Sequence, residues 1–572
     1  MAIELLRTLI ADDPCRSEFD LNNGNPLSAM PHAVTGPSPG VQALILCGPG
    51  SSFTTFNSSP DENPKALLPI ANRPMVWYPI DYCYRMGIND ITLICPASAK
   101  MAMQAALSTN PILTGLPHPR PEILAPADLT QTMGTAEILR LPELRSLVKG
   151  DFMVLPCDLV CELGGQKLLN AWMVQSASLG DVVGYEKLPG DSKITRSGGL
   201  GVFYETRGEI TRIKGEETDY IGITKIPATS ASTQKGSLLP DISNLVVSLP
   251  TDSYKDITEE HKGFPVRHSL LRAHPSVRFM SSKRDAHIYI LPHWIMDFVY
   301  KNETFESIGE DVVGWWAKAT WQDGLGTKLG LGELLNPKND DDAPASHNGS
   351  DTASVGHAET NGADSNTQNA AVDGSHGQTP LVVSVPSIQA YVHPTDPTGP
   401  IIRRVDTAKL LLHVSLQLAK LPSIEEAGGE PVSPFAHARK VAYPEGVQSR
   451  TTITKQDSLI ADNVTVEEKT SIKECVIGAN CQINEGAKLV QCLLMDGVKV
   501  GKGCKLTRCI LGKRSAIGAN SVLTDCEVQE NLMVEPRTEQ KDDRLMSSEG
   551  LEASDDEDAA MGDFAGGEAI HA

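Results

Sequence analysis

A glycine-rich turn and a lysine near the start of the chain have the residue types and spacing of a phosphate-binding site. The turn reads GPGSS from Gly48, with its second glycine at Gly50, and directly follows an apolar run. Glycines without side chains allow backbone N–H groups to approach phosphate oxygens. Lys65 follows fifteen positions after Gly50 and could bring a flexible positive charge to a phosphate. Each feature also has a plain structural interpretation, as a tight turn and as a solvated loop lysine.

Two later segments could complete this site. Gly134 and Thr135 form a turn that opens a helix-like run, and Asp158 stands at the end of the strand-like run 151–158. Ligands of open α/β sheets bind at the carboxyl ends of strands, where a carboxylate could hold Mg²⁺. Asp158 is therefore a candidate metal ligand, with capping of the next helix as the alternative. Because no second carboxylate is identified, we predict no metal site, and no cofactor is expected.

Alternating strand-like and helix-like segments over residues 41–335 would position these residues. The predicted strands are 41–48, 91–96, 151–158, 181–188, 201–208, 244–250 and 287–292, and the predicted helices are 75–87, 101–109, 167–178 and 293–302. This order predicts an α/β domain with a Rossmann-like mixed sheet, mainly parallel with some antiparallel strands.

A repeat between positions 458 and 536 is the clearest pattern in the chain. Large apolar residues recur at spacings of six, six and five: Ile460, Val466, Ile472, Ile477, Ile483, Leu489, Leu494, Val500, Leu506, Leu511, Ile517, Leu523, Val528 and Val534. In most coils, a small residue follows four positions after each of the first two large apolar residues. These small residues are Val464, Thr470, Cys481, Ala487, Val498, Cys504, Ser515 and Ser521. One large apolar side chain per side and a small one per corner predict a triangular solenoid. The pattern resembles the hexapeptide-repeat left-handed β-helix.

Four cysteines form a column within this repeat, because they recur at the same position of successive coils: Cys475, Cys492, Cys509 and Cys526. A metal-binding or redox role is one hypothesis for the column. Packing is favoured over it, since cysteine behaves as a small hydrophobic residue.

Charge and composition divide the rest of the chain. The formal net charge is −22, of which −6 lies in residues 337–380 and −9 in residues 539–572, so the remainder is only mildly acidic. These two segments have few apolar residues and are predicted to be disordered. The predicted regions are a poorly ordered extension (1–40), the α/β domain (41–335), an acidic insertion (336–380), the end of the α/β domain with a connector (381–445), the β-helix (446–536) and an acidic tail (537–572).

Several classes of protein are disfavoured. No run of about 18 uncharged apolar residues is present to span a membrane, and the N-terminal segment lacks the features of a secretory signal. A basic stripe typical of direct nucleic-acid binding is missing too. The twelve cysteines show no CxxC or zinc-ligand spacing, so we expect reduced thiols and a cytosolic location. Met30 is a candidate alternative start.

Together, the site segments resemble the sugar-nucleotide pyrophosphorylase (nucleotidyltransferase) superfamily. Residues 63–75, NPKALLPIANRPM, match that family's P-K-x-L-x-P-[IV]-x-N-[KR]-P pattern nearly completely. The run Gly134-Thr135-Ala136 matches the G-T-A turn, and Asp158 matches the aspartate of the metal strand. The resemblance implies the superfamily's fold and a nucleotide pocket made of Gly48, Gly50, Lys65, Gly134, Thr135 and Asp158.

The glycine turn departs from the family pattern G-x-G-[ST]-R-L, because Ser52 and Phe53 replace the arginine and the leucine. In the family, that arginine would stabilise charge on the nucleotide phosphates. Its loss would cost about 10²–10³ in rate. We therefore expect the pocket to be vestigial, with no catalytic residues.

Residues 64–94 and 285–299, the repeat of the β-helix and the arginine loss are similar to the gamma-subunit family of eukaryotic translation initiation factor two-B. The resemblance implies a component of a guanine-nucleotide exchange factor that releases GDP from initiation factor two. The implied partners are an epsilon-type catalytic subunit, alpha-, beta- and delta-type regulatory subunits, and initiation factor two, with neither membrane nor nucleic acid. Epsilon subunits carry an additional C-terminal helical domain, and no such segment is expected after Val534.

Two other functions have partial support in the sequence. An active sugar-1-phosphate nucleotidyltransferase, of the GDP-mannose or ADP-glucose pyrophosphorylase type, is the alternative, but it needs the loop arginine. An acyltransferase would present a catalytic histidine from the β-helix, and no histidine occurs between His437 and His571.

Overall fold

The computed structural model describes residues 39–130, 132–176, 198–206, 213, 216–226, 236–335, 385–396, 399–428 and 432–547. All of them belong to one compact unit that begins at Pro39. Outside the described residues lie nearly all of the predicted N-terminal extension, the predicted strand 181–188, the acidic insertion from residue 336 and the tail from residue 548. No helix in the described parts of the chain is long and apolar enough to cross a membrane.

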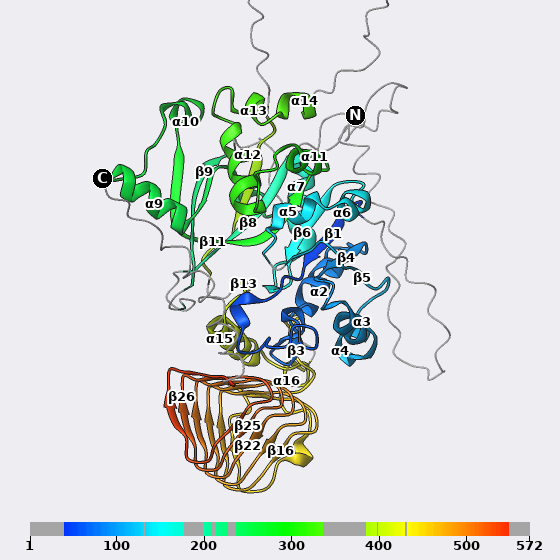
Figure 1. Ribbon diagram of the computed structural model, residues 1–572, viewed down its shortest axis with the longest axis vertical. Coiled ribbons are helices and arrows are strands. Elements are labelled where there is room, and N and C mark those ends of the chain that lie inside the picture. Colours follow the sequence, from blue (N-terminus) through cyan, green and yellow to red (C-terminus); the bar gives the residue numbers. More distant parts are fainter. Residues whose placement is uncertain are drawn as a thin grey trace, which may run out of the picture. The chain divides into compact units, whose positions relative to one another are not determined.

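The α/β domain contains a mixed sheet in the order β5-β4-β1-β6-β11-β8-β12-β10-β9 (Figure 1). Its strands are β1 (Gln42–Leu46), β4 (Ile91–Ile94), β5 (Glu122–Leu124), β6 (Phe152–Pro156), β8 (Gly199–Glu205), β9 (Asp219–Lys225), β10 (Ile242–Pro250), β11 (Val277–Leu291) and β12 (Ile388–Val392). Strands β5, β4, β1 and β6 are parallel, and β12 is parallel to β8. Strand β11 is antiparallel to β6, β8 and β9, and β10 is antiparallel to β9 and β12. The antiparallel share is therefore larger than the sequence indicated.

Helices and small strand pairs complete this domain. The helices are α2 (Trp77–Arg85), α3 (Lys100–Thr109), α4 (Pro111–Thr114), α5 (Thr135–Arg140), α6 (Pro142–Leu147), α7 (Gly165–Ser176), α9 (Thr251–His261), α10 (His268–Ala273), α11 (Trp294–Lys301), α12 (Val313–Ala319), α13 (Leu325–Lys328), α14 (Leu331–Leu335), α15 (Ala408–Ala419) and α16 (Ile424–Ala427). The pairs are β2 (Pro69–Ile70) with β3 (Arg73–Pro74), and β7 (Leu159–Cys161) with β13 (Ile402–Arg404).

Side chains of the interior strand β1 alternate between two apolar cores. Ala43 and Ile45 belong to a core shared with α2, α3, α7 and α15. Leu44 belongs to a second core shared with α5, α6, α11 and α12. Because successive side chains of a strand point to opposite faces, an apolar run such as QALIL requires helices on both faces of the sheet. The predicted strands and helices near β1 are confirmed. The strand predicted at 287–292 is the end of the much longer β11, which begins at Val277.

The predicted left-handed β-helix is confirmed. Its strands form three parallel sheets, and each strand pairs with the corresponding strand of the next coil, as Ile460 pairs with Ile477. One sheet contains β14 (Thr452–Ile453), β17 (Ser471–Lys473), β20 (Lys488–Val490), β23 (Lys505–Thr507), β26 (Val522–Thr524) and β29 (Glu539–Lys541). The second contains β15 (Leu459–Ile460), β18 (Val476–Ile477), β21 (Leu493–Leu494), β24 (Ile510–Leu511), β27 (Glu527–Val528) and β30 (Arg544–Leu545). The third contains β16 (Thr465–Val466), β19 (Gln482–Ile483), β22 (Lys499–Val500), β25 (Ala516–Ile517) and β28 (Met533–Val534).

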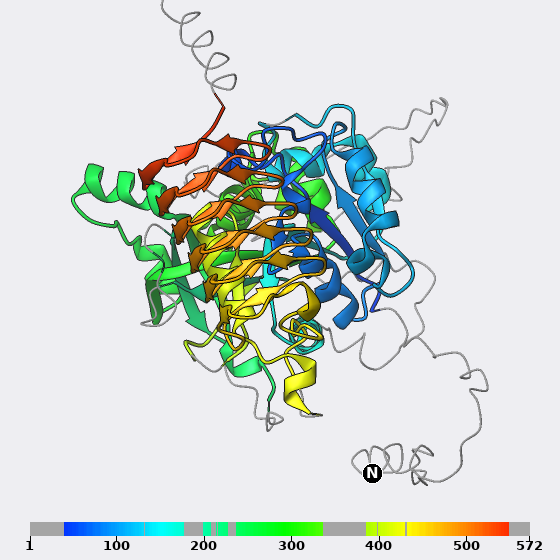
Figure 2. The ribbon, with the colours of Figure 1, turned by 90° about the horizontal axis from the view of Figure 1, so that it is seen from below.

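The interior of the β-helix holds the large apolar residues of the repeat, and all four column cysteines are buried there (Figure 2 shows the stacked coils). Many corners turn through residues with a left-handed backbone, such as Asn480 (φ 58°) and Arg508 (φ 52°). Strands β29 and β30 lie beyond residue 536, so the solenoid continues into the segment that was predicted as the beginning of the acidic tail.

One side of the β-helix packs on the α/β domain. Leu459, Val476, Leu493 and Ile510 belong to the same apolar core as β1 and α15. Their side chains point out of the solenoid, next to the inward residues of the repeat, and helix α15 contacts β18 and β21. Asn72 Nδ2 also donates a hydrogen bond to the Ile477 carbonyl at 3.0 Å. The two domains are thus joined by a shared apolar core and by polar contacts.

Candidate functional site

A cavity of about 230 Å³, the larger of two beside the glycine turn, lies at the carboxyl ends of β1, β4 and β6. Of the six residues predicted for the nucleotide pocket, Gly48, Lys65, Thr135 and Asp158 line it. Gly50 and Gly134 are not among its lining residues. The carboxyl edge of a parallel sheet is where the sequence placed the site, because Gly48 follows β1 and Asp158 follows β6.

A buried ion pair contributes to the lining of this larger cavity. Lys65 Nζ lies 2.7 Å from Asp158 Oδ2, and the Asp158 side chain is 2% exposed. Burial alone would raise the pKa of Asp158, but the positive charges of Lys65 and Arg404 outweigh it and hold that pKa well below its usual range. Burial acts to lower the pKa of Lys65, and Asp158 outweighs this effect, so the lysine pKa is raised. Both groups are therefore charged at neutral pH.

Arg404 is a cavity residue that the sequence analysis missed. It ends β13, where it pairs with Leu159 of β7, and the backbone N–H of Val405 donates to the Asp158 carbonyl at 2.8 Å. This pairing brings Arg404 Nε to 3.5 Å from Asp158 Oδ1. The pairing of β13 with β7 brings together these two residues, which lie far apart in the chain, and the sequence shows no motif that would have revealed it.

The ion pairs continue away from the cavity as a chain of alternating charges. Arg404 Nη2 lies 3.9 Å from Asp406 Oδ2. Asp406 is bound in turn by Arg284 of β11, which lies 3.5 Å from Glu216 Oε1. Arg284 and Glu216 are buried. These contacts attach β13 and the start of α15 to the central sheet.

Gly50 shapes the glycine turn. Its backbone is left-handed (φ 84°), and a Cβ built there would lie 2.8 Å from Lys65 Cβ and 2.9 Å from Asn57 Nδ2. Gly50 thus allows the turn to pack directly on the lysine. The two positions that depart from the family pattern follow it: Ser52 is exposed, and Phe53 is buried with Lys65 Nζ 5.7 Å from its ring centre. Neither supplies a positive charge.

The turn at Gly134 and Thr135 is closed by another part of the chain. A Cβ at Gly134 would lie 2.2 Å from the Glu306 carbonyl oxygen, which accepts a hydrogen bond from Ala136 N at 2.8 Å. Thr135 Oγ1 accepts from the backbone N–H of Ile308 at 2.9 Å. This turn therefore supports the wall of the cavity, which Met133 and Thr135 line.

His287 is the second lining residue that the sequence analysis did not select. It sits in a bulge of β11 between Asp285 and Tyr289, with a left-handed backbone (φ 52°). Burial and the charge of Arg404 lower its pKa well below its usual value, so the imidazole is neutral at physiological pH. The neighbouring Asp285 has its pKa raised to about 7 by burial and by Asp219. Since a bulge depends on strand register, the sequence could not show that His287 turns toward the cavity.

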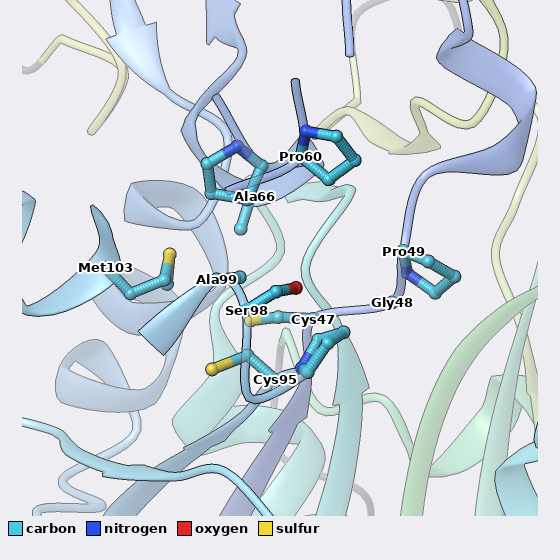
Figure 3. A pocket seen from close by; sticks show the side chains of 11 residues that line it. Cys47, Gly48, Pro49, Pro60, Ala66, Cys95, Ser98, Ala99 and Met103 are labelled. Atoms are coloured by element: carbon cyan, nitrogen blue, oxygen red, sulfur yellow. The ribbon is translucent and has the colours of Figure 1, made fainter. Parts of the chain in front are cut away.

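A second, much smaller cavity of about 20 Å³ lies against the glycine turn (Figure 3). Its lining includes Cys47, Cys95 and Met103 together with several prolines, and none of its lining residues carries a charged side chain. This volume suits about one water molecule. Of these two cavities at the glycine turn, the larger one alone has room for a phosphate-sized ligand.

The residues around Asp158 do not fit a divalent metal ion. Mg²⁺ prefers oxygen ligands at about 2.0–2.1 Å and Ca²⁺ binds six to eight of them, but the close neighbours of this carboxylate are the Lys65 ammonium and the Arg404 guanidinium. Within the residues that the structure describes, no three His, Cys, Asp or Glu side chains are grouped to hold a metal.

Comparison with known proteins adds two findings. Residues 441–539 match a family model described as the EIF2B subunit epsilon LbH domain. The chain is also 28% identical over 305 residues to "Translation initiation factor eIF2B subunit gamma" from Schizosaccharomyces pombe, which covers 53% of this chain and 56% of that protein. The chain is similar to eIF2B gamma. The matched segment spans about half the length of that curated relative.

The two comparisons name different eIF2B subunits. The family model covers only the β-helix, whereas the match to the gamma subunit covers about half of the chain. The longer match therefore weighs more for the kind of subunit. The nucleotidyltransferase-like α/β fold and the hexapeptide-repeat β-helix agree with this similarity to eIF2B, and the resemblance inferred from the sequence is confirmed.

Proposed function

We propose that the chain is a gamma-type subunit of the guanine-nucleotide exchange factor that releases GDP from initiation factor two. The similarity to an eIF2B gamma subunit over 53% of the chain carries this proposal. In this function the chain acts with an epsilon-type subunit in the catalytic subcomplex, and with alpha-, beta- and delta-type regulatory subunits. We expect this assembly in the cytosol, with no membrane and no direct nucleic-acid contact.

The mechanism that we propose is one of binding. An exchange factor lowers the affinity for nucleotide because it binds the nucleotide-free state of its substrate more tightly. The α/β domain and the β-helix, joined by a shared core, offer one continuous body for docking partner subunits. No side chain of this chain needs to form or break a covalent bond in such a role.

We further propose that Gly48, Gly50, Lys65, Gly134, Thr135 and Asp158 are remnants of a nucleotidyltransferase pocket, with no catalytic residue and no metal among them. Three observations support this proposal. Ser52 replaces the loop arginine of the family, Lys65 is already paired with Asp158, and basic side chains surround that carboxylate. The alternative function, an active sugar-1-phosphate nucleotidyltransferase, would have to proceed without the loop arginine.

Native mass spectrometry of the tagged chain, purified from its own cells, tests the proposal first. We expect a large complex that contains an epsilon-type subunit and three regulatory subunits, and we expect depletion of the chain to slow GDP release from initiation factor two. Recovery as a homo-oligomer without those subunits contradicts the proposal.

A pyrophosphate-exchange assay separates the alternative. A sugar-1-phosphate nucleotidyltransferase incorporates labelled pyrophosphate into a sugar nucleotide with Mg²⁺, and Asp158→Asn abolishes that activity. We expect no incorporation above the background of a reaction without protein. Incorporation that is lost in the Asp158→Asn variant would establish the enzyme and would overturn the vestigial pocket.

A further inference from the structure

We propose that the acidic tail of the chain, residues 548–572, docks on the outer surface of the chain's own β-helix. The docking site is a lysine belt, defined by four exposed side chains: Lys488, Lys499, Lys502 and Lys505. None of these lysines lines the cavities beside the glycine turn. The contact is thus separate from the candidate pocket, and it does not depend on the proposed exchange function.

The lysine belt lies outside the apolar core that the two domains share. The β-helix packs on the α/β domain through the sheet that contains β18 and β21. Lys499 belongs to β22 and Lys502 follows it at the corner, while Lys488 and Lys505 belong to β20 and β23 of the remaining sheet. Figure 2 looks onto the side of the β-helix that is turned away from the α/β domain. The belt is therefore open to a ligand on the outer surface.

Positive charge is concentrated on one coil of the β-helix. The coil 495–511 has four basic residues and one acidic residue, which gives a net charge of +3. The coils on either side, 478–494 and 512–528, each have equal numbers of basic and acidic residues. The excess charge of the belt is therefore not balanced by the neighbouring coils.

Three belt lysines have no carboxylate within ion-pair distance among the described residues: Lys488, Lys499 and Lys505. Lys502 is the exception, since its Nζ lies 4.0 Å from Glu485 Oε2. Lys488 and Lys505 also lie opposite each other, in register on β20 and β23. Like charges directly opposite each other on adjacent strands destabilise a sheet. An acidic segment laid along the belt relieves this repulsion.

An apolar strip borders the lysine belt on the next two coils. Ala516 is paired with Lys499 and Val522 with Lys505, so an apolar side chain follows each lysine along the β-helix. Met533 is paired with Ala516 in turn and is 79% exposed. The surface therefore fits a segment that combines carboxylates with apolar side chains.

The acidic tail has this composition. Residues 548–572 contain eight acidic residues and neither lysine nor arginine, and four of the acids are consecutive, from Asp555 to Asp558. Leu551 precedes this run by four positions, and Met561 follows it by three. The insertion 337–380 is the other acidic segment, but its net charge of −6 is spread over 44 residues. The tail, with −8 over 25 residues, complements the belt better.

The tail also begins close enough to reach the belt. Ser547 is the last described residue before it, and its backbone N–H donates to Gln529 Oε1 at 2.6 Å in the last coils of the β-helix. The belt coil lies two coils before β30, about 10 Å along the axis at a strand spacing of about 4.8 Å. Asp555 is eight residues beyond Ser547 and can extend about 26 Å. Because a short tether gives millimolar effective concentrations, ion pairs that are weak individually suffice.

Carbodiimide cross-linking tests the contact, because this reagent joins a lysine amine to a carboxylate that touches it. The sample is the full-length chain, together with any subunits that purify with it, and peptide mass spectrometry locates the links. We expect links from the belt lysines to Asp555–Asp558. These links should become much fewer in 1 M NaCl, where the Debye length falls to about 3 Å.

Lysine acetylation gives an independent measurement in a variant with a neutral tail, in which Asp555, Asp556 and Asp558 become Asn and Glu557 becomes Gln. The belt lysines should be acetylated at least about threefold faster in this variant than in the natural chain, since the ion pairs that cover them are lost. Lys262, an exposed lysine of the α/β domain, is the internal reference. The matched control neutralises four acids of the insertion and should leave the rates unchanged: Asp340→Asn, Asp341→Asn, Asp342→Asn and Asp351→Asn.

Co-expression of two variants distinguishes a chain's own tail from the tail of a second copy. One chain has the neutral tail, and the other has all four belt lysines replaced by Gln. Links between belt and tail can then form only between two copies, so we expect none.

Three results would each overturn the proposal. The first is a set of belt cross-links that lead only to the insertion or to another subunit, because the occupant would then be a different acidic segment. The second is an equal acetylation rate of the belt lysines in the natural chain and the neutral-tail variant. The third is a belt-to-tail link in the co-expressed pair, which would assign the tail to a second copy.

Discussion

Asn63 Nδ2 donates a hydrogen bond to Glu530 Oε2 at 2.8 Å, and this contact ties a loop of the α/β domain to a late coil of the β-helix. Glu530 is 6% exposed and also accepts from Ser58 Oγ at 2.8 Å and from the backbone N–H of Ser59. The same loop returns to the glycine turn, where Asn57 Nδ2 donates to the Pro49 carbonyl at 2.6 Å. One buried carboxylate of the β-helix therefore positions the loop next to the candidate site.

Glu530→Ala should release this loop. The substitution leaves three donors without their charged acceptor, and hydrogen bonds to charged groups contribute roughly 1.5–3 kcal/mol each, with incomplete additivity. We expect the free energy of unfolding to fall by about 2–4 kcal/mol and hydrogen exchange to accelerate over residues 51–64. Glu535→Ala, at an exposed position of the next turn, is the control. Equal exchange in both variants would mean that the loop holds its position without Glu530.

Gly134→Ala and Gly48→Ala should differ strongly in stability, although both glycines belong to the predicted pocket. At Gly134 a Cβ would lie 2.2 Å from a backbone carbonyl, and at Gly48 it would meet nothing within 4 Å. Overpacking costs about 1–3 kcal/mol or more, so we expect at least about 2 kcal/mol for Gly134→Ala. Gly48→Ala should remain within about 0.5 kcal/mol of the natural chain. Urea unfolding measures both, and similar losses would show that the close contact at Gly134 relaxes easily.

Asp285 should make the protein less stable as the pH rises. Its pKa is about 7 in the folded chain against about 3.9 when unfolded. The folded state therefore binds the extra proton, and this contribution to stability is complete below about pH 4 and is lost as the pH rises to about 7. The expected slope is about 1.4 kcal/mol per pH unit.

Urea unfolding between pH 5.5 and 7.5 measures this effect. The Asp285→Asn variant should lack the part of the pH dependence of the free energy of unfolding that comes from this aspartate. The difference in free energy of unfolding between the natural chain and the variant should therefore shrink steadily as the pH rises. Asp128→Asn removes an exposed aspartate and serves as the control. Parallel stability curves for the natural chain and Asp285→Asn would contradict the raised pKa.

The column cysteines of the β-helix should be inert in the folded protein. They are buried, and burial, together with the contact between their thiols, raises the pKa of Cys492 and Cys509 well above the ordinary value. Since the thiolate is the reactive form, iodoacetamide should label the column only after unfolding. Peptide mass spectrometry with a denatured sample as the control measures this. Labelling at the same rate in both samples would favour a reactive role over packing.

Local patterns were enough to predict the β-helix and much of the α/β domain. The repeat fixes its own register, because each coil pairs with a similar next coil and a slip would turn Ile460 or Leu489 out of the core. Gly48 and Asp158 were placed correctly at strand ends, since a strand and the turn that follows it are neighbours in sequence. The extension of the solenoid through β29 and β30 was missed because the repeat loses its large apolar residues there, with Gln540 in place of one of them.

Residue patterns along the chain suffice for the two domain types and for the segments from which the pocket is built, because these depend on interactions between residues near one another in the chain. What those residues do depends on folding in three dimensions. Arg404 reaches Asp158 across 246 positions through the pairing of β13 with β7, and Glu306 closes the turn at Gly134 across 172 positions. His287 enters the cavity through a bulge that only strand register creates. Contacts of this kind arise from the packing of elements already formed, so no spacing in the sequence records them.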